Sequence, residues 1–471
     1  MEKHEHARRG SQASLRSPLA ATGARTRPHF LLVALAVLPL ALPAEASPGR
    51  EDGDRSAIHG TGYLCTTEPT CALSFIRDAT RVRTANGPVI LAVGGSYSVS
   101  AFTVGESPTK PILWSSAATP GQPWELPDSA DGTTLPPTSF LTASAITRDG
   151  RHIASRANYF DGSHTRRVAV QVDVSPGSGL AFSNPTFTTT VLGLPAGSNQ
   201  SASVNMSDAG SVIYGFAPIG AFRWLRNVSG LFVVPTLPGF SSGPVPVGRA
   251  GVSSDGSIAL LSARGDSDSH VIGYLYDYNS NALTVLSPLP GDTDVQPFAM
   301  TSDGQVVVGG SFLIDSSGSW VAGQVATWAA KGGFQPKPLG SPNPGWRTSG
   351  FGGITANGEA VVMTFDETDP STGDNTSRPY LLNKCGFFKL EEVLSAARID
   401  LSGWLLTFQT LATDVNSLAG IYGVSPDGRL VFGGAPHSAD VIAGSATFGT
   451  EGYVAEIPKD HLKNYGGCRR R

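Results

Sequence analysis

Charged residues and cysteines are scarce in this sequence: only 15% of its 471 residues are Asp, Glu, Lys or Arg, and four are Cys. The zinc-binding patterns C-x-x-C and H-E-x-x-H are both absent, so we expect no zinc site. After residue 46, no apolar run is long enough to cross a bilayer as a helix. These absences argue against a zinc protein and against a membrane span.

Glycine and proline are abundant instead. The chain contains 56 Gly and 34 Pro, which together exceed ordinary usage but stay below the level of low-complexity disorder. This composition favours many short strands joined by turns.

Residues 1–46 resemble an export signal. A basic stretch leads into the apolar run LLVALAVLPLALPAEA, which ends in the small-x-small pattern Ala44-Glu45-Ala46. Cleavage there would remove six of the 34 basic and three of the 38 acidic residues, leaving 28 and 35, a net charge of −7. We therefore expect a secreted, periplasmic or cell-surface protein, and no nucleic-acid partner.

The four cysteines, Cys65, Cys71, Cys385 and Cys468, all follow this signal, which fits an oxidising compartment. Four cysteines allow three connectivities, and the sequence does not choose among them. We favour the pairs Cys65 with Cys71 and Cys385 with Cys468.

One phrase recurs along the chain, as in AMTSDGQVVVGG from Ala299 and GVSPDGRLVFGG from Gly423. Its seven copies are marked by the turn glycines Gly87, Gly150, Gly210, Gly256, Gly304, Gly358 and Gly428. The successive separations are 63, 60, 46, 48, 54 and 70 residues, and the shortest match one propeller blade.

Each copy predicts a strand, a tight turn and a second strand, because Asn-Gly and Asp-Gly accept the positive φ of a hairpin turn. The second strand is apolar without alternation, as in Val306-Val307-Val308, so both its faces must be buried. A second hairpin follows, as in GAFRWLRNVSGLFVV from Gly220. Each repeat therefore has four strands.

Sheets buried on both faces must stack, and closing the stack into a ring removes its exposed ends. We predict an all-β fold, a β-propeller of about seven four-stranded blades, with six or eight as alternatives. We expect a disordered linker at 47–64, the propeller at 65–458, a tail at 459–471 and a helix near 390–400. The strand near Cys71–Arg77 should pair with the strand near Tyr453–Ile457 and close the ring.

The phrase, followed by a strand of the A-F-x-W type, resembles the HAF-repeat family of bacterial secreted extracellular repeat proteins. The likeness is clearest from Cys385 to Pro458, and the H-A-F triplet itself is absent, with Ala221-Phe222 nearest to it. The endings Gly94-Gly95, Gly309-Gly310 and Gly433-Gly434 also resemble kelch blades. The resemblance implies a secreted propeller and supplies no catalytic residues.

No residue is assigned a catalytic or cofactor-binding role. The G-x-S-x-G match at 239–243 is followed by Pro244 and Pro246, so it lacks the helix that a nucleophile elbow needs. The turn carboxylates Asp149, Asp255, Asp303 and Asp427 have a backbone role. Trp114, Trp224 and Trp328 fall on third strands, where they favour a blade core over sugar stacking.

Two sites stay open. Asp366, Asp369 and Asp374 form an acidic stretch that could hold Ca²⁺, although the spacing does not match a calcium loop. His152, His164, His270 and His437 are far apart in sequence but could meet at the channel of a propeller.

The residues favour a secreted, non-enzymatic and monomeric propeller that binds a protein or polysaccharide partner through its loop faces. The alternative is a propeller hydrolase or lyase that acts on carbohydrate or a small ester.

Overall fold

The computed structural model describes residues 56–64, 74–97, 109–118, 122–129, 141–160, 164–177, 182–240, 245–248, 250–265, 270–314, 320–343, 347–368, 375–410, 420–441 and 448–467. All of them belong to one compact unit, residues 52–471. The expected signal and three of the four cysteines lie outside the described residues.

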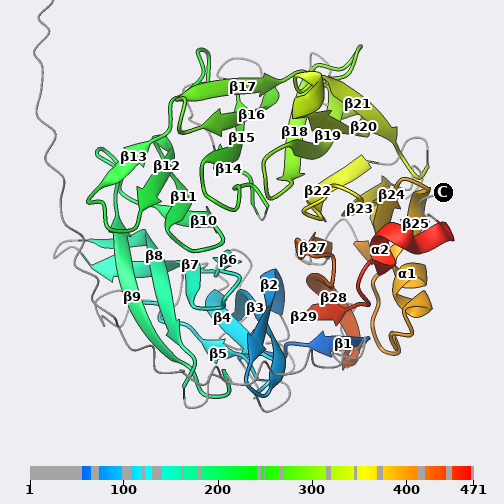
Figure 1. Cartoon of the computed structure of the whole chain (residues 1–471), viewed down its shortest axis with the longest axis horizontal. Helices are drawn as coiled ribbons and strands as arrows, with labels where there is room; N and C mark the ends of the chain where they lie inside the picture. The colour runs from blue at the N-terminus through cyan, green and yellow to red at the C-terminus, as the bar shows by residue number, and fades with distance from the viewer. Residues whose placement is uncertain are drawn as a thin grey trace, which may run out of the picture. The chain divides into compact units, whose positions relative to one another are not determined.

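Seven antiparallel sheets, the blades, follow one another around a central axis (Figure 1). Blade 1 contains β2 (Ser74–Thr84), β3 (Gly87–Tyr97), β4 (Thr109–Ser115) and β5 (Trp124–Glu125). Blade 2 contains β6 (Ala145–Ile146), β7 (His152–Phe160), β8 (Thr165–Ser175) and β9 (Thr186–Gly193). Blade 3 contains β10 (Ala202–Met206), β11 (Val212–Ala217), β12 (Gly220–Leu225) and β13 (Leu231–Val233).

The later blades repeat this order. Blade 4 contains β14 (Val245–Pro246), β15 (Ile258–Arg264), β16 (Val271–Asp277) and β17 (Ala282–Leu286). Blade 5 contains β18 (Asp294–Met300), β19 (Val306–Ile314), β20 (Trp320–Ala329) and β21 (Pro336–Gly340). Blade 6 contains β22 (Arg347–Ile354), β23 (Ala360–Thr368), β24 (Asn375–Asn383) and β25 (Gly386–Lys389), and β26 (Phe408–Thr410) also pairs with β24. Blade 7 contains β27 (Gly420–Val424), β28 (Leu430–Val441) and β29 (Phe448–Glu456), completed by β1 (Ala57–Gly60). The predicted seven-bladed propeller is thus confirmed.

The second strands are largely buried on both faces, as the apolar run of β19 predicts. Val307 and Val308 are successive residues of β19, and both are fully buried. Because side chains alternate along a strand, Val307 packs in a cluster shared with blade 4 and Val308 in one shared with blade 6. Seven such apolar clusters among the described residues each join two neighbouring blades. The core is therefore the set of interfaces between blades.

The first strand of the described chain closes the ring. Residues 57–60 pair with β29 in antiparallel register, with Ile58 opposite Ala455. The N–H of Thr61 extends the pairing by donating to the carbonyl of Gly452 at 2.9 Å. An N-terminal strand thus completes the last blade, as predicted. The prediction that this strand lies near Cys71–Arg77 was wrong.

Residues 74–77 belong to β2, the first strand of blade 1, and pair with β3. The closing strand instead lies within residues 47–64, which we expected to be a disordered linker. The short segment AIHG contains a single large aliphatic residue. Its strand conformation depends on the free edge of β29, a partner almost 400 residues away that no local pattern reveals.

Two short helices cover the outside of blades 6 and 7. The predicted helix is α1 (Leu390–Ala396), which buries Leu390, Val393 and Leu394. The expected tail contains α2 (His461–Asn464), whose Leu462 is buried in the same cluster. No helix in the described residues is long and apolar enough to cross a membrane.

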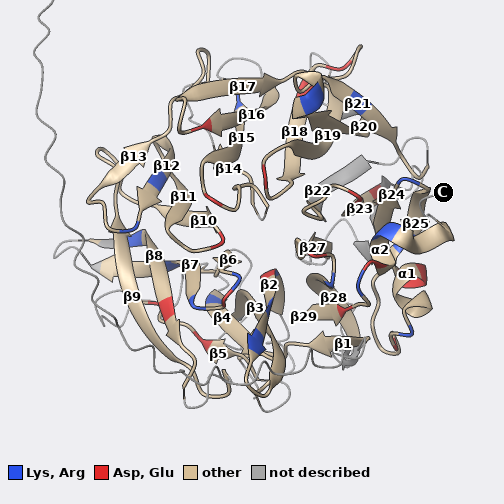
Figure 2. Cartoon of the chain, viewed as in Figure 1, with Lys and Arg blue, Asp and Glu red and all other residues tan. Residues whose placement is uncertain are grey.

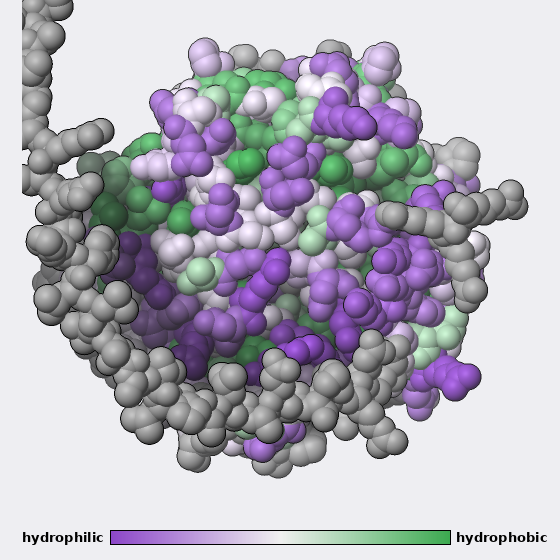
Figure 3. All heavy atoms as spheres, in the orientation of Figure 1, coloured by the Kyte–Doolittle hydropathy of each residue, from purple (hydrophilic) through white to green (hydrophobic). Residues whose placement is uncertain are grey.

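The surface reflects the low content of charge. Lys, Arg, Asp and Glu are thinly spread along the strands (Figure 2). On the face shown in Figure 3, hydrophilic residues gather over the lower half, where the first and last blades meet.

Candidate functional site

The innermost strands of the blades line the central channel, which contains a cavity toward each of their two ends. The turn-side cavity lies at the ends of these strands, where the repeated turns begin, and measures about 70 Å³. The bulge-side cavity lies toward their beginnings and measures about 320 Å³. Only the second is within the volume range of ordinary ligand pockets, roughly 300 to 1,000 Å³.

The turn-side cavity is ringed by one residue from each of several turns, two positions before the turn glycine. These residues are Arg148, Asp208, Ser254, Ser302 and Pro426. Their backbones form a belt from blade to blade, since the N–H of Asp208 donates to Ser254 at 3.0 Å and that of Ser254 donates to Ser302 at 2.7 Å. The belt therefore links neighbouring blades at the turn end of the channel.

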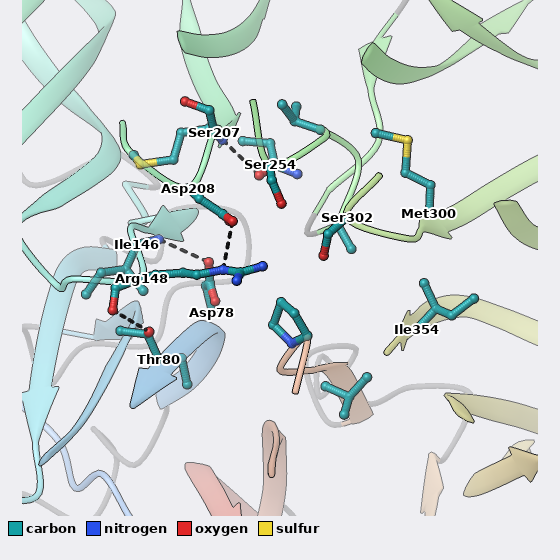
Figure 4. Close-up of a pocket in the computed structure, with 17 residues that line it drawn as sticks. Asp78, Thr80, Ile146, Arg148, Ser207, Asp208, Ser254, Met300, Ser302 and Ile354 are labelled. Atoms are coloured by element: carbon teal, nitrogen blue, oxygen red, sulfur yellow. Dashed lines mark hydrogen bonds and ion pairs between the residues drawn. The ribbon is translucent and has the colours of Figure 1, made fainter. Parts of the chain in front are cut away.

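The charges at the turn-side cavity are paired. The guanidinium of Arg148 lies 2.8 Å from the carboxylate of Asp208 (Figure 4). The carboxylate of Asp78 accepts a hydrogen bond from the N–H of Ile146 at 3.0 Å. Asp208 is free for this pairing because its turn reads Ser-Asp-Ala-Gly, which moves the acid one place earlier than in Thr-Ser-Asp-Gly. The carboxylates of Asp78 and Asp208 therefore both line this cavity, but the cavity is too small for a sugar ring.

A β-bulge in the innermost strand supplies residues of the bulge-side cavity. In blades 1, 3, 5 and 7 the pairing register shifts by one residue, at Arg77, Val204, Phe298 and Tyr422. All four residues line the cavity. A bulge leaves one residue out of the ladder and redirects its side chain, so these blades turn one residue each toward the channel.

The glycine that ends the repeated phrase faces this bulge. Gly94, Gly309 and Gly433 lie on second strands, and a Cβ at any of them would overlap a backbone carbonyl of the innermost strand. At Gly309 that carbonyl belongs to Gln296, 2.5 Å from the Cβ position. The recurring glycine is therefore required by the close approach of two backbones, and through the bulge it shapes the cavity.

Two arginines distinguish the bulge-side cavity. It is lined by Arg77 from β2 and Arg156 from β7, together with hydroxyls of Thr142, Ser144 and Ser203. Phe216, Phe298 and Tyr422 supply aromatic surface. No carboxylate or imidazole of the described residues lines it.

The seven turn glycines all have positive φ. The carboxylate of Asp303 accepts hydrogen bonds from the hydroxyl of Thr301 at 2.6 Å and from the N–H of Gln305 at 3.0 Å. Asp149, Asp255 and Asp427 accept the equivalent pairs of bonds. In blade 6, Asn357 takes the same place and accepts from Thr355 at 2.8 Å and from the N–H of Glu359 at 3.1 Å.

These bonds predict the effect of two substitutions at Asp303. Asp303→Asn keeps an acceptor oxygen, as Asn357 does, and should change the free energy of unfolding by less than about 0.5 kcal/mol. Asp303→Ala removes the acceptor for two donors and should cost about 1 kcal/mol. Urea unfolding of both variants measures the contrast, and equal losses for Asn and Ala would show that the turn does not depend on this acceptor.

The histidines are not gathered at the channel. The ring of His152 lies 2.6 Å from Asp173 and that of His270 lies 2.8 Å from Asp294. His437 lies 3.9 Å from Glu451 in blade 7, and His164 directly precedes β8 at the surface. A histidine-based channel site is therefore not formed by these four residues.

Trp114 and Trp328 lie on third strands and are buried, as expected, while Trp224 is half-buried on β12. Asp366 lies in β23, where it accepts a hydrogen bond from Ser377 at 2.5 Å, and burial raises the pKa of its carboxyl group. Its expected companions Asp369 and Asp374 lie outside the described residues. Among the residues that the structure describes, no three His, Cys, Asp or Glu side chains form a metal-binding group.

Cys385 lies in the turn between β24 and β25, as expected. Cys65, Cys71 and Cys468 lie outside the described residues, so the two favoured pairings remain predictions.

Sequence reasoning missed the bulge-side cavity, although a signal exists. The residue six positions before the turn glycine lines it in five blades: Ser144, Val204, Phe298, Gly352 and Tyr422. The chemistry at this position varies from blade to blade, whereas the turn glycine that fixes its spacing does not, which is typical of a site built on a constant frame. Arg77 departs from this spacing and could not have been found in this way.

No family model matches the chain, and no curated protein sequence is similar to it. Several solved structures are similar in fold. Oligogalacturonate lyase from Vibrio parahaemolyticus has a TM-score of 0.47 and 12% identity, over 86% of this chain and 98% of that one. The GH74 xyloglucanase from Xanthomonas campestris has a TM-score of 0.45 and 12% identity, over 83% and 55%. TolB from Acinetobacter baumannii has a TM-score of 0.38 and 15% identity, over 62% of this chain and 60% of that one. Identities this low carry no conclusion about activity.

Proposed function

We propose that this protein is a secreted, non-enzymatic propeller that binds a protein or polysaccharide partner on the face that contains the bulge-side cavity. The observation that carries the proposal is the cavity itself, which measures about 320 Å³ and is lined by hydroxyl, aromatic and guanidinium groups. Such groups bind and orient a ligand. The export signal expected at residues 1–46 supports the extracellular placement, as do cysteines confined to the chain after it.

The topology of the blades makes this face the variable one. Innermost strands begin here, and the connections between second and third strands also start and end here. The turn face carries instead the short repeated turns, whose residues are committed to hydrogen bonds within and between blades. Connections that vary in length on a rigid scaffold are where binding surfaces form.

Filling the cavity tests the proposal. Gly248 lines its rim, and a Cβ there would meet no atom within 4 Å, so Gly248→Phe should occupy the cavity without disturbing the fold. We expect the variant to melt like the wild type and to lose at least about 10-fold in affinity for a polysaccharide or protein that the wild type retains in a binding panel.

The matched control is Gly332→Phe, at an exposed glycine in the short helix after β20 that also has open space around it. It should bind like the wild type. Equal binding by Gly248→Phe and the wild type would place the ligand elsewhere, and turnover of any ligand in the panel would favour the hydrolase or lyase alternative.

A further inference from the structure

The bulge-side cavity holds two guanidinium groups that lack an acidic partner. Arg77 is the bulge residue of β2, and Arg156 lies on the second strand of blade 2. In the described part of the chain, neither forms an ion pair with Asp or Glu. The Nε of Arg77 is buried and has no hydrogen-bond partner. A buried guanidinium nitrogen without an acceptor is costly.

Aromatic rings hold these groups in place. The guanidinium of Arg77 lies 4.8 Å from the ring centre of Tyr422 and 5.3 Å from that of Phe75. That of Arg156 lies 5.1 Å from the ring centre of Phe216. Contact with a ring face stabilises the cation without using its N–H groups. The donors of both arginines therefore remain available.

The two cations also interact with each other. Burial, followed by the charges of Arg167 and Arg77, lowers the pKa of Arg156 to about 10. The group is still protonated at neutral pH, so the cavity concentrates positive charge in a protein whose mature chain is expected to be acidic. An oxyanion between the guanidiniums would accept their hydrogen bonds and offset their repulsion.

We propose that the bulge-side cavity binds an oxyanion, a carboxylate or phosphate group on a small ligand or at the end of a polymer, through Arg77 and Arg156. This inference rests on the proposed function, because it names the chemistry of a ligand at the same cavity. Ser144 and Ser203 also line the cavity, but their hydroxyls donate to the backbone carbonyls of Ser203 and Val170, so the arginines are the donors to the anion. The volume suits a sugar-sized body that carries the charged group.

Three probes with one common body separate charge from shape. They are D-glucuronate, glucose 6-phosphate and glucose, titrated into the full protein by calorimetry. We expect at least one of the two anions to bind at least about 10-fold more tightly than glucose, because charge-assisted bonds to two guanidiniums strengthen binding. The order of the two anions distinguishes a carboxylate site from a phosphate site. Equal affinity for glucose and both anions, or binding of none, would overturn the proposal.

Charge-removing variants identify the residues. Arg77→Gln and Arg156→Gln should each weaken binding of the better anion by about 10- to 100-fold. Arg151→Gln is the control, because Arg151 is exposed in a turn at the other end of the channel and its loss changes the net charge equally. Unchanged binding in the first two variants, or an equal loss in the control, would refute a specific role for this pair.

Melting curves separate binding from a structural role. Without ligand, Arg156→Gln should melt at or above the wild-type temperature, since it removes a half-buried cation that Arg77 repels, while the stabilisation by added anion should disappear. A lower melting temperature with the anion effect intact would overturn the proposal. Binding of D-glucuronate should also be constant between pH 6 and 8, and binding of either anion should fall as the pH rises toward about 10, where Arg156 loses its proton.

The proposed function and this inference can fail separately. If Gly248→Phe abolishes capture of a partner and the arginine variants do not affect that capture, the cavity binds the partner, but the proposal that it recognises an oxyanion is wrong. If the arginine variants abolish anion binding and Gly248→Phe leaves partner capture unchanged, the oxyanion site is correct and the partner binds elsewhere.

Discussion

Deletion of residues 57–60 is expected to destabilise the propeller by about 2 to 5 kcal/mol. The deletion removes the fourth strand of blade 7, including the pairing of Ile58 with Ala455 and the packing of Ile58 on the apolar cluster of blades 6 and 7. Each lost backbone hydrogen bond contributes about 1 kcal/mol, and partial burial of Ile58 adds about 1 to 2 kcal/mol. The conformational entropy that the strand loses when it becomes ordered offsets part of this stabilisation.

The measurement is the midpoint of denaturant unfolding, compared with a matched deletion of residues 52–55 that leaves β1 intact. The variant without β1 should also aggregate more readily, because β29 then presents a free edge. Unfolding at the same denaturant concentration for both deletions would show that the ring does not depend on this strand.

Gly94→Ala should cost about 2 to 4 kcal/mol, although it adds a single methyl group. A Cβ at Gly94 would overlap the carbonyl oxygen of Phe75 and press against the backbone of Ile76, and neither atom belongs to a flexible side chain. The strands would have to separate at the bulge, which strains the packing of a buried sheet. The same substitution should weaken anion binding, because Arg77 is the residue that the bulge directs into the cavity.

Gly332→Ala is the matched control, since Gly332 has open space around it and its substitution should change stability by less than about 0.5 kcal/mol. Denaturant unfolding measures both variants. If Gly94→Ala unfolded like the control, the close approach of the two backbones would not be the reason for the recurring glycine.

Much of the site could not be predicted, for reasons that particular residues make clear. Arg77 lies in RDATRVRTANG, where nothing distinguishes it from Arg81 or Arg83. Arg81 pairs with Glu456 at 3.1 Å, whereas Arg77 lies in a bulge and forms no ion pair with a described residue. Arg156 is 79 residues away in the next blade. Only the packing of blade 1 against blade 2, together with the bulge of β2, brings the two cations to one cavity.

The sequence by itself determined the architecture of each blade. Asp-Gly and Asn-Gly turns, apolar second strands and a recurring terminal glycine are local patterns whose physical demands, a positive φ and burial on both faces, admit few alternatives. Tertiary structure alone decided which strand closes the ring and which side chains meet in the channel. Closure depends on an edge left free at the far end of the chain, and the site on contacts between separate blades, neither of which has a local signature in the sequence.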